Sequence, residues 1–545
     1  MSRDPCRAYF IGGQMPPAAF DPAVVGGKAA NLARLQRLGL PVPPALALTT
    51  DLARAFMRGS ALPAGLRRRI APWLRGLEHA ASTALGAPTQ LVVSIRSSPP
   101  KSMPGMLGTV LDAGMNEDAV AALIRQTGSP WLAWDTYRRF IRSFAERVRH
   151  CPAAPFERIA AEHLAAAGAE TLQDLDPISM RSLARASAAR FEELTGAPLP
   201  RDRVTQVLEA VAAVLASWTS PSARAYRRLN GLDDATGTGV LIQAMVFGNS
   251  GPRSGSGVAF TRDPATGNPG LYVDFASNGQ GEDVVAGRLP VAGGARLPAL
   301  LPAVWAQLQS ARSLLEREFR DMQDLEFTVD DGRLFYLQTR PGKRTPWAAL
   351  RIATDLVREG VLDEATAVER LAPYDLDAIR RVVVAPGPLD RPIAQAIPAS
   401  VGVATGAVVF DAARTRDPGG RPTVLLRSEL TTDDIAGLAA AAGVLTTFGG
   451  RTSHAAVVAR QLGKVCLVGC ASLRCDEGGR SGSLGGRRLR EGDEITLDGE
   501  SGVIYDGRVP VVTERPVEDL ALVRRWRTRQ APPEALTTAE GTGPA

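Results

Sequence analysis

Apolar residues follow two different periods along the first half of the chain. Residues 7–112 combine short apolar runs, such as ALALTT and LVVSIR, with stretches of helical spacing, such as AANLARLQRLG, which predicts a mixed α/β or α+β unit. Residues 116–232 follow the helical period almost throughout. Within them, WLAWDTYRRFIRSFAERV places its aromatic residues on one helical face, which predicts core packing. The pattern therefore predicts a mixed unit that carries a helical insert.

Strand-like alternation returns between residues 239 and 340. The segment LEFTVDDGRLFYLQ has two alternating runs around an Asp-Gly pair, which favours the tight turn of a β-hairpin. Asp324 and Glu326 lie two residues apart on the first run, and Gln338 and Arg340 lie two apart on the second. Residues two apart on a strand share a face, so we expect the hairpin to bring the two pairs side by side.

The second half of the pattern predicts a separate unit behind a linker. Residues 343–381 are again helical, and a proline-rich stretch at 385–392 is typical of a linker or hinge. Residues 395–510 alternate strands with helices and contain glycines throughout, which predicts a second α/β unit. After residue 516 we expect one short amphipathic helix and then a disordered tail.

The composition is that of an ordinary globular protein. Hydrophobic residues make up 45% and charged residues 22% of 545 residues, so about two to four domains are expected. No apolar run approaches the roughly 18–20 residues of a membrane span, and the N-terminus lacks an apolar signal core, so we expect a cytoplasmic protein without membrane contact. The net charge of +6 is interspersed, which argues against a nucleic-acid partner. The cysteines form no CxxC pair, so we expect reduced thiols and no zinc site.

Lysine is rare in this chain. Arginine and lysine together number 63, and lysine occurs only at Lys28, Lys101, Lys343 and Lys464. Since arginine is used almost everywhere a cation will serve, a retained lysine is a candidate for a role that needs a compact ammonium group. Chance retention is the alternative, and we prefer it for Lys464.

Two stretches near the N-terminus suit phosphate. Two glycines precede Lys28, which opens a predicted helix, and the N–H groups of a helix start suit a phosphate together with one ammonium, although so short a pattern also arises by chance. Further along, the strand LVVSIR delivers Arg96 to a loop of serine, proline and glycine that contains Lys101. Arg96 suits either a phosphate clamp or an ion pair with a carboxylate, and the sequence leaves both open.

The predicted hairpin suits a metal. Asp324, Glu326 and Gln338 offer two carboxylates and an amide oxygen, which are hard ligands for Mg²⁺, and Arg340 suits a phosphate. A solvent-exposed polar face is an equally good interpretation of this spacing.

A histidine stands at the start of a predicted helix. In FGGRTSHAAVVAR, serine or threonine can cap the helix, His454 falls in its first turn, and Gly463 ends it. Imidazole is a competent nucleophile toward phosphorus, and a helix N-terminus stabilises a phosphoryl group. Taken alone, His454 fits a surface or capping residue better than a phosphoryl carrier.

Together and in this order, the stretches resemble the pyruvate phosphate dikinase family of phosphoenolpyruvate-utilising enzymes, from FIGG near the start to about Tyr505. The resemblance rests on GGKAANLARLQRLGLPVPP, SIRSSPPKSMPGMLGTV, VLIQAMVFGNSGPRSGSGVAFTRDPATG, NGQGEDVVAG, DMQDLEFTVDDGRLFYLQTRPGKRT and FGGRTSHAAVVARQLGKVCLVGC. It implies a multidomain α+β and α/β fold: an ATP-grasp nucleotide-binding domain at 1–340 with its helical insert, a helical linker and hinge at 341–392, a swivelling phosphohistidine β/β/α domain at 393–512, and a short helix with a disordered tail at 513–545.

The family's chemistry gives each motif a role. In this family the pyrophosphoryl unit of ATP passes to a histidine and AMP leaves, and inorganic phosphate then removes one phosphoryl group as pyrophosphate. The resemblance implies ATP as substrate and Mg²⁺ as cofactor, and it leaves room for a homodimer and for a regulatory kinase and phosphatase. The implied residues are His454 as the carrier, Lys28, Arg96 and Arg340 on the ATP phosphates, Asp324, Glu326 and Gln338 on Mg²⁺, Lys101, Gln243, Met245 and Glu282 on the nucleotide, and Thr452 as a regulatory threonine.

The sequence departs from the family in three places. The family's dikinases continue into a barrel that binds phosphoenolpyruvate and pyruvate, and such a barrel needs about 250 residues that do not follow here. We therefore expect a separate barrel protein as a partner. Ser98-Pro99-Pro100 stands where the family has a glycine-alanine pair, and Gly108 replaces an aspartate, so we expect a stiffer loop with one charge fewer.

Three functions are compatible with these observations. The first is a half-enzyme that phosphorylates its own histidine from ATP and passes the phosphoryl group to pyruvate only with a barrel partner. The second is a phosphotransferase with a different acceptor, and the third is a non-catalytic ATP-binding regulatory protein. The complete set of ligand and carrier residues favours the first.

Overall fold

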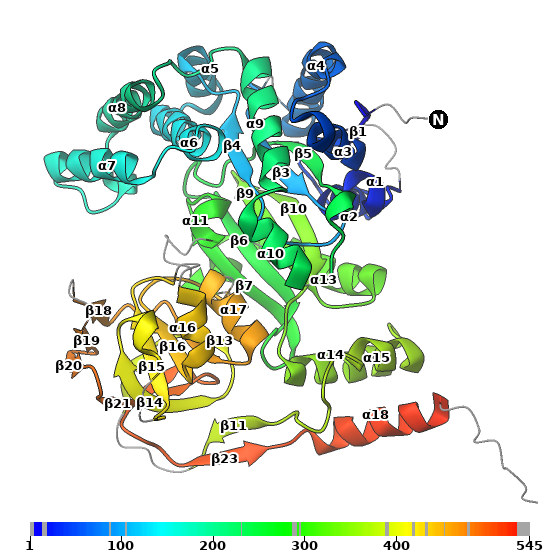
Figure 1. Ribbon diagram of the computed structural model, residues 1–545, viewed down its shortest axis with the longest axis vertical. Coiled ribbons are helices and arrows are strands. Elements are labelled where there is room, and N and C mark those ends of the chain that lie inside the picture. Colours follow the sequence, from blue (N-terminus) through cyan, green and yellow to red (C-terminus); the bar gives the residue numbers. More distant parts are fainter. Residues whose placement is uncertain are drawn as a thin grey trace, which may run out of the picture.

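The chain folds into an N-terminal unit and a C-terminal unit that are joined by a helical linker (Figure 1). The expected multidomain mixture of helices and strands is confirmed. None of the described helices is long and apolar enough to cross a bilayer. The computed structural model describes residues 5–13, 19–86, 89–103, 106–229, 231–285, 292–293, 296–386, 392–416, 420–430, 434–451, 453–476 and 480–530.

The first sheet of the N-terminal unit is buried on both faces. On one face, Ala45, Ala47 and Leu241 pack against α2 (Gly27–Arg37), and the alternate residues on the other face pack against α4 (Gly65–Leu85) and α9 (Arg203–Ser217). Burial on both faces explains why these strands are continuous apolar runs, although they pair antiparallel. The strand order is β1 (Ala8–Ile11), β2 (Ala45–Leu48), β5 (Gly239–Ala244), β3 (Val93–Ser98) and β4 (Thr109–Ala113).

Helices fill the chain between β4 and β5. Asn116, Ser129 and Asp202 cap three of them by accepting hydrogen bonds from N–H groups of the first turn. The aromatic stripe that the sequence predicts for the core is buried, and Phe140 and Phe144 lie 5.3 Å apart between ring centroids. The helices are α5 (Glu117–Thr127), α6 (Pro130–Val148), α7 (Ala154–Ala167), α8 (Pro177–Thr195), α9 and α10 (Pro221–Leu229).

The second sheet contains the predicted hairpin. Asp331 and Gly332 both have positive φ, 46° and 80°, as the tight turn requires, so the hairpin prediction is confirmed. Helix α13 (Pro302–Phe319) covers one face of this sheet with apolar residues, and the opposite face carries polar side chains. The strand order is β10 (Arg333–Pro341), β9 (Gln323–Asp330), β6 (Gly255–Arg262), β7 (Pro269–Ser277) and β8 (Ala292–Gly293).

A buried ion pair ties this sheet to α13. Arg262, which is 0% exposed at its side chain, donates to both carboxylate oxygens of Glu316 at 3.0 and 2.9 Å. We expect Glu316→Ala to lower the free energy of unfolding by about 3 kcal/mol, at the low end of the cost of breaking a buried pair, because the guanidinium keeps Glu359 at 2.6 Å as its remaining close partner. Urea denaturation measures this loss. The matched control is Glu494→Ala, which removes an exposed partner of Arg508 and should cost less than about 1 kcal/mol. Equal losses in the two variants would contradict the prediction.

The C-terminal unit has three layers, as a β/β/α domain requires. Its eight-stranded sheet packs a small sheet against one face, through Leu473, Leu484 and Leu489, and helices against the other. The helices are α16 (Ile435–Ala440) and α17 (His454–Leu462), and the small sheet is β18 (Leu473–Cys475), β19 (Ser481–Leu484) and β20 (Arg487–Arg490). The large sheet runs β12 (Pro392–Gln395), β22 (Val503–Asp506), β21 (Glu494–Asp498), β14 (Val403–Val409), β15 (Thr423–Arg427), β16 (Gly443–Thr446), β17 (Val465–Val468) and β13 (Ile397–Ser400).

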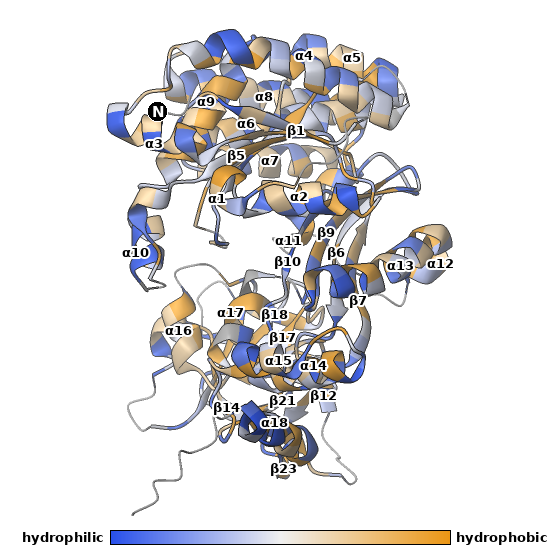
Figure 2. Ribbon diagram, turned by 90° about the vertical axis from the view of Figure 1, so that its right-hand side faces the viewer, coloured by the Kyte–Doolittle hydropathy of each residue, from blue (hydrophilic) through white to orange (hydrophobic). Residues whose placement is uncertain are grey.

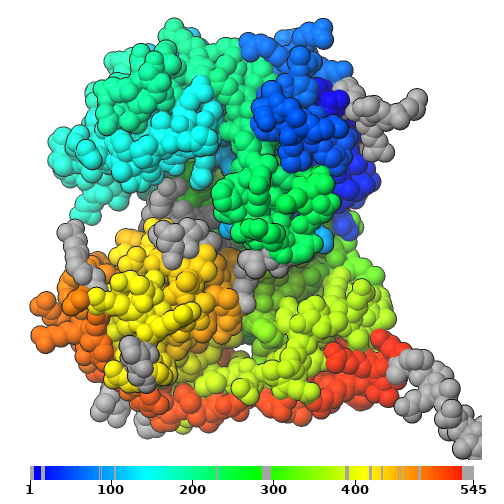
Figure 3. Space-filling view, in the orientation of Figure 1, coloured from blue at the N-terminus to red at the C-terminus, as the bar shows by residue number. Residues whose placement is uncertain are grey.

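Two crossings join the units. The chain leaves α14 (Pro346–Arg358) and α15 (Glu364–Leu371) through β11 (Arg381–Val384), and it returns through β23 (Val511–Glu514), which pairs antiparallel with β11. Figure 3 shows this C-terminal segment in red along the lower edge of the molecule. It ends in α18 (Val517–Gln530), which is largely polar in Figure 2 and packs on α14 and α15 with three residues, Leu520, Val523 and Trp526.

Candidate active site

The face of the second sheet opposite α13 presents two rows of paired residues across four strands. Register places Arg340, Asp324, Phe260 and Tyr272 in one row, from β10 through β9 and β6 to β7. The neighbouring row is Gln338, Glu326, Val258 and Asp274. The expected meeting of the two hairpin pairs is therefore confirmed, since Glu326 lies opposite Gln338 and Asp324 opposite Arg340.

Arg96 reaches this face from the end of β3 in the other sheet. Its Nη2 donates to Glu326 Oε2 at 2.9 Å and to Gln338 Oε1 at 3.1 Å, and its Nη1 donates to Gln243 Oε1 at 3.3 Å. Of the two roles that the sequence left open, the structure shows the ion pair with a carboxylate. The same guanidinium lies where it could turn to a phosphate that approaches Glu326 and Gln338.

Three cations converge beside two carboxylates. Arg340 Nε donates to Asp324 Oδ2 at 2.8 Å. Burial lowers the pKa of Lys28 to about 7, and the charges of Arg96 and Arg340 act in the same direction against the attraction of Glu326. Burial opposes ionisation of Glu326, but Arg96 and Arg340 outweigh it and lower the pKa of Glu326. A cluster with more positive than negative charge suits a polyanion.

The carboxylate pair fits a hard cation. Burial raises the pKa of Asp324, although Arg340 opposes the rise, and the Oδ1 atom of Asp324 is buried without a hydrogen-bond partner among the described residues. A buried oxygen without a donor is costly, and a cation bound there would satisfy it. Asp324, Glu326 and Gln338 supply the oxygen ligands that Mg²⁺ prefers.

The start of α2 is closed rather than open to a ligand. Gly27 N donates to Pro99 O at 2.9 Å, and Ala29 N donates to Ser98 Oγ at 3.2 Å. These two N–H groups therefore have partners within the chain, and the phosphate role of this helix start stays a prediction that depends on Lys28. Gly26 has φ of 82°, and a Cβ there would lie 1.6 Å from Ser98 O, so only glycine permits this contact. The departure at Ser98 and Pro99 thus acts as a cap for α2.

The other predicted nucleotide residues are more widely spread. Gln243 is buried on β5 and accepts from Arg96, and Met245 just beyond that strand is partly buried against the core of the insert. Glu282 lies on α11 (Gly281–Val285) and forms an ion pair with Arg139 of α6 at 3.1 Å. Lys101 is exposed in the loop after β3. Gln243 therefore lies in the cluster of Arg96 and Glu326, while Glu282 belongs to a second group of charges.

Sequence reasoning missed Arg139. Its guanidinium contacts Asp135 at 2.7 Å, Asp283 at 2.7 Å and Glu282, so it ties the helical insert to the edge of the second sheet. A signal was present, because Asp135 and Arg139 are oppositely charged residues one turn apart on α6. This spacing favours an ion pair on the helix, although it does not indicate the further contacts with α11.

Helix α17 begins at His454, as the sequence predicts. Ser453 is its N-cap and accepts from Ala456 N at 3.4 Å, and Gly463 ends it with φ of 64°. Gly449, five residues before His454, has φ of 113°, a conformation that favours glycine. The side chain of His454 and the whole of Thr452 lie outside the described residues.

Comparisons with known proteins find separate matches in the N-terminal and the C-terminal unit. Residues 57–292 match the family model described as "Pyruvate phosphate dikinase, AMP/ATP-binding domain", and residues 419–502 match "PEP-utilising enzyme, mobile domain". The pyruvate, phosphate dikinase of Rhizobium meliloti (strain 1021) is 39% identical over 97% of this chain. The pyruvate, phosphate dikinase of Clostridium symbiosum is 40% identical over 89% of this chain, and the chloroplastic pyruvate, phosphate dikinase of Flaveria pringlei is 40% identical over 92% of it. The chain spans 61%, 56% and 53% of the lengths of these three relatives.

Proposed function

Since the chain carries the AMP/ATP-binding domain and the mobile domain of the pyruvate phosphate dikinase family, we propose that it transfers the pyrophosphoryl unit of ATP to His454. The histidine nitrogen would attack the β-phosphorus, the bridge to the α-phosphorus would break, and AMP would leave. Inorganic phosphate would then take the γ-phosphoryl group as pyrophosphate. The observation that carries this proposal is the convergence of Lys28, Arg96 and Arg340 beside Asp324 and Glu326.

The ion pairs of the cluster support a division of roles between its cations and its carboxylates. Arg96 and Arg340 are paired with Glu326 and Asp324. Magnesium at these carboxylates and Gln338 would neutralise phosphate charge. Both guanidiniums and Lys28 would hold the phosphates of ATP. Phosphoryl transfer depends chiefly on such positioning and charge neutralisation.

The remaining assignments follow from the same proposal. We assign nucleotide binding to residues 1–340, with the helical insert at 116–232, the linker and hinge to 341–392, and the carrier domain to 393–512. The short helix and tail at 513–545 complete the chain. Further contacts to the nucleotide fall to Lys101, Gln243, Met245 and Glu282, and Thr452 is the proposed site of regulation.

The acceptor of the second phosphoryl group is a separate proposal. We infer that pyruvate receives it only when a barrel protein with a phosphoenolpyruvate and pyruvate site joins this chain. What supports this inference is that the three relatives are named as pyruvate, phosphate dikinases. A different acceptor is the alternative, and it is tested by adding pyruvate with a candidate barrel chain: formation of phosphoenolpyruvate excludes it.

Position-specific labelling of ATP tests the first transfer. With Mg²⁺, label from the β- and γ-phosphates should enter the protein in an acid-labile form, and label from the α-phosphate should appear only in AMP. Inorganic phosphate should then release the γ-label as pyrophosphate and leave the β-label on the protein. If ADP is the product instead of AMP, the protein transfers only the γ-phosphoryl group, and the proposed pyrophosphoryl transfer is wrong. Nucleotide binding without any AMP would favour a regulatory protein.

The depressed pKa of Lys28 makes nucleotide binding sensitive to pH. We expect the affinity for ATP with Mg²⁺ to fall as the pH rises above about 7, because the free protein loses the charge of Lys28 by about tenfold for each further pH unit. Phosphate favours the charged form, so binding at pH 8 should take up a proton. Calorimetry in two buffers of different ionisation enthalpy measures that uptake, and Lys28→Met should abolish it. Equal uptake in wild type and variant would assign the proton to ATP itself.

A further inference from the structure

The C-terminal unit sits on the same sheet face as the predicted ligands. Arg451, three residues before His454, extends from it over β7 of the N-terminal unit. Its Nη1 lies 3.7 Å from Asp274 Oδ1, and its guanidinium carbon lies 4.5 Å from the centre of the Tyr272 ring. Arg451 thus meets a buried carboxylate and an aromatic face at once, two contacts that favour a cation.

A second arginine makes a similar contact from α17 itself. Arg460 is 1% exposed, and its guanidinium carbon lies 5.7 Å from the centre of the Phe260 ring on β6. Its charge is stabilised by Asp324, Asp274 and Asp263 of the N-terminal unit, although burial lowers its pKa overall. Phe260 and Tyr272 are direct cross-strand neighbours, so the two arginines cover one aromatic pair.

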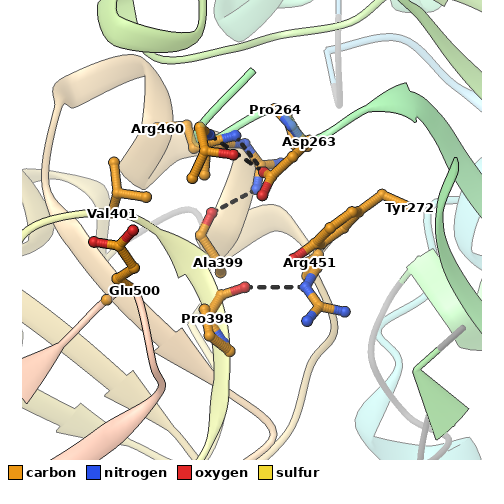
Figure 4. A pocket seen from close by; sticks show the side chains of 12 residues that line it. Asp263, Pro264, Tyr272, Pro398, Ala399, Val401, Arg451, Arg460 and Glu500 are labelled. Carbon is orange, nitrogen blue, oxygen red and sulfur yellow. Dashed lines mark hydrogen bonds between the residues drawn. The ribbon is translucent and has the colours of Figure 1, made fainter. Parts of the chain in front are cut away.

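Both arginines are held on their own unit by one strand. Arg451 Nε donates to Pro398 O at 3.1 Å, and Arg460 Nη1 donates to Ala399 O at 2.7 Å, two successive carbonyls of β13. Figure 4 shows both arginines in the lining of one pocket, Arg460 near Asp263 and Arg451 near Tyr272 of the N-terminal unit. A cavity of about 20 Å³ remains between the units, enough for about one water molecule. A polar, incompletely filled contact favours reversible docking over permanent association.

The register of the sheet fixes the place of this contact. Tyr272 and Asp274 of β7 lie in the same two rows as Asp324 and Glu326 of β9, with only β6 between them. Neighbouring strands lie about 4.8 Å apart, so β7 and β9 are separated by roughly 10 Å. The predicted ligands of ATP and metal occupy one half of the face, and the segment that carries His454 occupies the other.

We propose that Arg451 and Arg460 are positioning residues that seat α17 on β6 and β7, and thereby hold His454 beside the ATP phosphates for the first transfer. This inference rests on the proposed function, and it adds the receptor surface, namely Tyr272, Asp274 and Phe260. Neither arginine is assigned to the reacting atoms. They act by increasing the fraction of time that the segment with His454 spends next to the nucleotide.

The test uses the full chain and its Arg451→Met variant. We expect the single-turnover rate of labelling from ATP to fall by about ten- to a hundredfold, because misplacement of a reacting group by an ångström can cost that much. The dissociation constant for ATP with Mg²⁺ should stay within about twofold. Arg451→Lys should recover part of the rate, since it restores the charge without the planar stacking surface. The matched control is Arg488→Met, which changes an exposed arginine on β20 and should leave the rate unchanged.

A second variant tests the receptor side. Asp274→Asn should slow labelling, and the double variant with Arg451→Met should be little slower than either single one, because both remove the same contact. Effects that multiply in the double variant would overturn the proposal. So would a wild-type rate in Arg451→Met.

Small-angle X-ray scattering separates this inference from the proposed function. Without any nucleotide, Arg451→Met should shift the protein from the docked form to a more extended one, while Arg488→Met should not. If wild type forms no phosphoprotein and the scattering still shifts, the phosphotransfer chemistry fails and the seat stands. If wild type is labelled and Arg451→Met changes neither scattering nor rate, the seat is wrong.

Discussion

Replacing His454 with asparagine is expected to abolish ATP-dependent labelling of the protein and to leave nucleotide affinity within about twofold. Asparagine is similar in size to histidine but has no nucleophilic nitrogen, so the loss should be at least a thousandfold, on the order seen for other essential nucleophiles. The helix should survive, because Ser453, and not His454, caps α17. Quantitative capture of acid-labile phosphoprotein, with calorimetry for the nucleotide, measures both quantities.

Another histidine of the chain provides the control. His163 lies on α7, where its Nδ1 contacts Ile159 O at 2.9 Å and its Nε2 contacts Ser182 Oγ at 3.3 Å. His163→Asn should label at the wild-type rate. Labelling that persists in His454→Asn and disappears in His163→Asn would move the carrier to the helical insert and remove the basis of the proposed mechanism.

Local patterns predicted the parts of the site that a short segment determines. The hairpin follows from a period of two around an Asp-Gly turn, and the turn alone sets which residues of β9 and β10 lie opposite one another. In the same way, a serine and a glycine ten residues apart are enough to place both ends of α17. In both cases, the information lies within about 20 residues of sequence.

The contacts of Arg96 could not be predicted in this way. Strand β5 begins about 140 residues after β3, yet it lies between β2 and β3 in the sheet, and it places Gln243 beside Arg96. No local pattern encodes this pairing. The closure of α2 by Ser98 and Pro99 has the same origin, because the strand that precedes this loop is held next to the helix by tertiary packing.

The docking of the two units could be predicted even less from the sequence. The pattern predicted a hinge near 385–392 but gave no sign of where the C-terminal unit rests. Arg451 and Arg460 resemble any other arginines in a chain that is rich in them. Only the register of β6 and β7, which places an aromatic pair and Asp274 beneath them, distinguishes these two positions.

Replacing Arg96 with methionine is expected to have the second-largest effect. Labelling from ATP should fall by about a hundred- to a thousandfold, the usual loss when one preorganised donor to a developing charge is removed. The variant should also be less stable at pH 7, by about 1–3 kcal/mol, since Glu326 loses its 2.9 Å partner in a partly buried site. Arg96→Lys keeps the charge but cannot reach three acceptors at once, so its labelling rate should lie between those of wild type and Arg96→Met.

The pH dependence of that stability loss identifies its cause. In wild type, the lowered pKa of Glu326 contributes stability above its unfolded pKa, and this contribution is lost as the pH falls through the folded value. Without Arg96, the pKa of Glu326 should rise, and protonation then relieves the unpaired charge. The stability difference between wild type and Arg96→Met should therefore narrow as the pH is lowered from 7 to 5. A difference that stays constant would mean that lost packing, and not the unpaired carboxylate, is responsible.

Magnesium alone provides a second measurement of the same substitution. In the proposed mechanism, Arg96 would compete with Mg²⁺ for Glu326, so removal of the guanidinium should increase the stabilisation that Mg²⁺ gives in thermal unfolding, even as catalysis is lost. Glu326→Gln should remove most of that stabilisation, because it exchanges a carboxylate for an amide at the proposed metal. If Mg²⁺ stabilises Arg96→Met more than wild type and Glu326→Gln less than wild type, the proposed phosphate binding by Arg96 is distinguished from the proposed metal binding by Glu326. If Mg²⁺ stabilises Glu326→Gln as well as wild type, Glu326 is not a metal ligand, and its ion pair with Arg96 is purely structural.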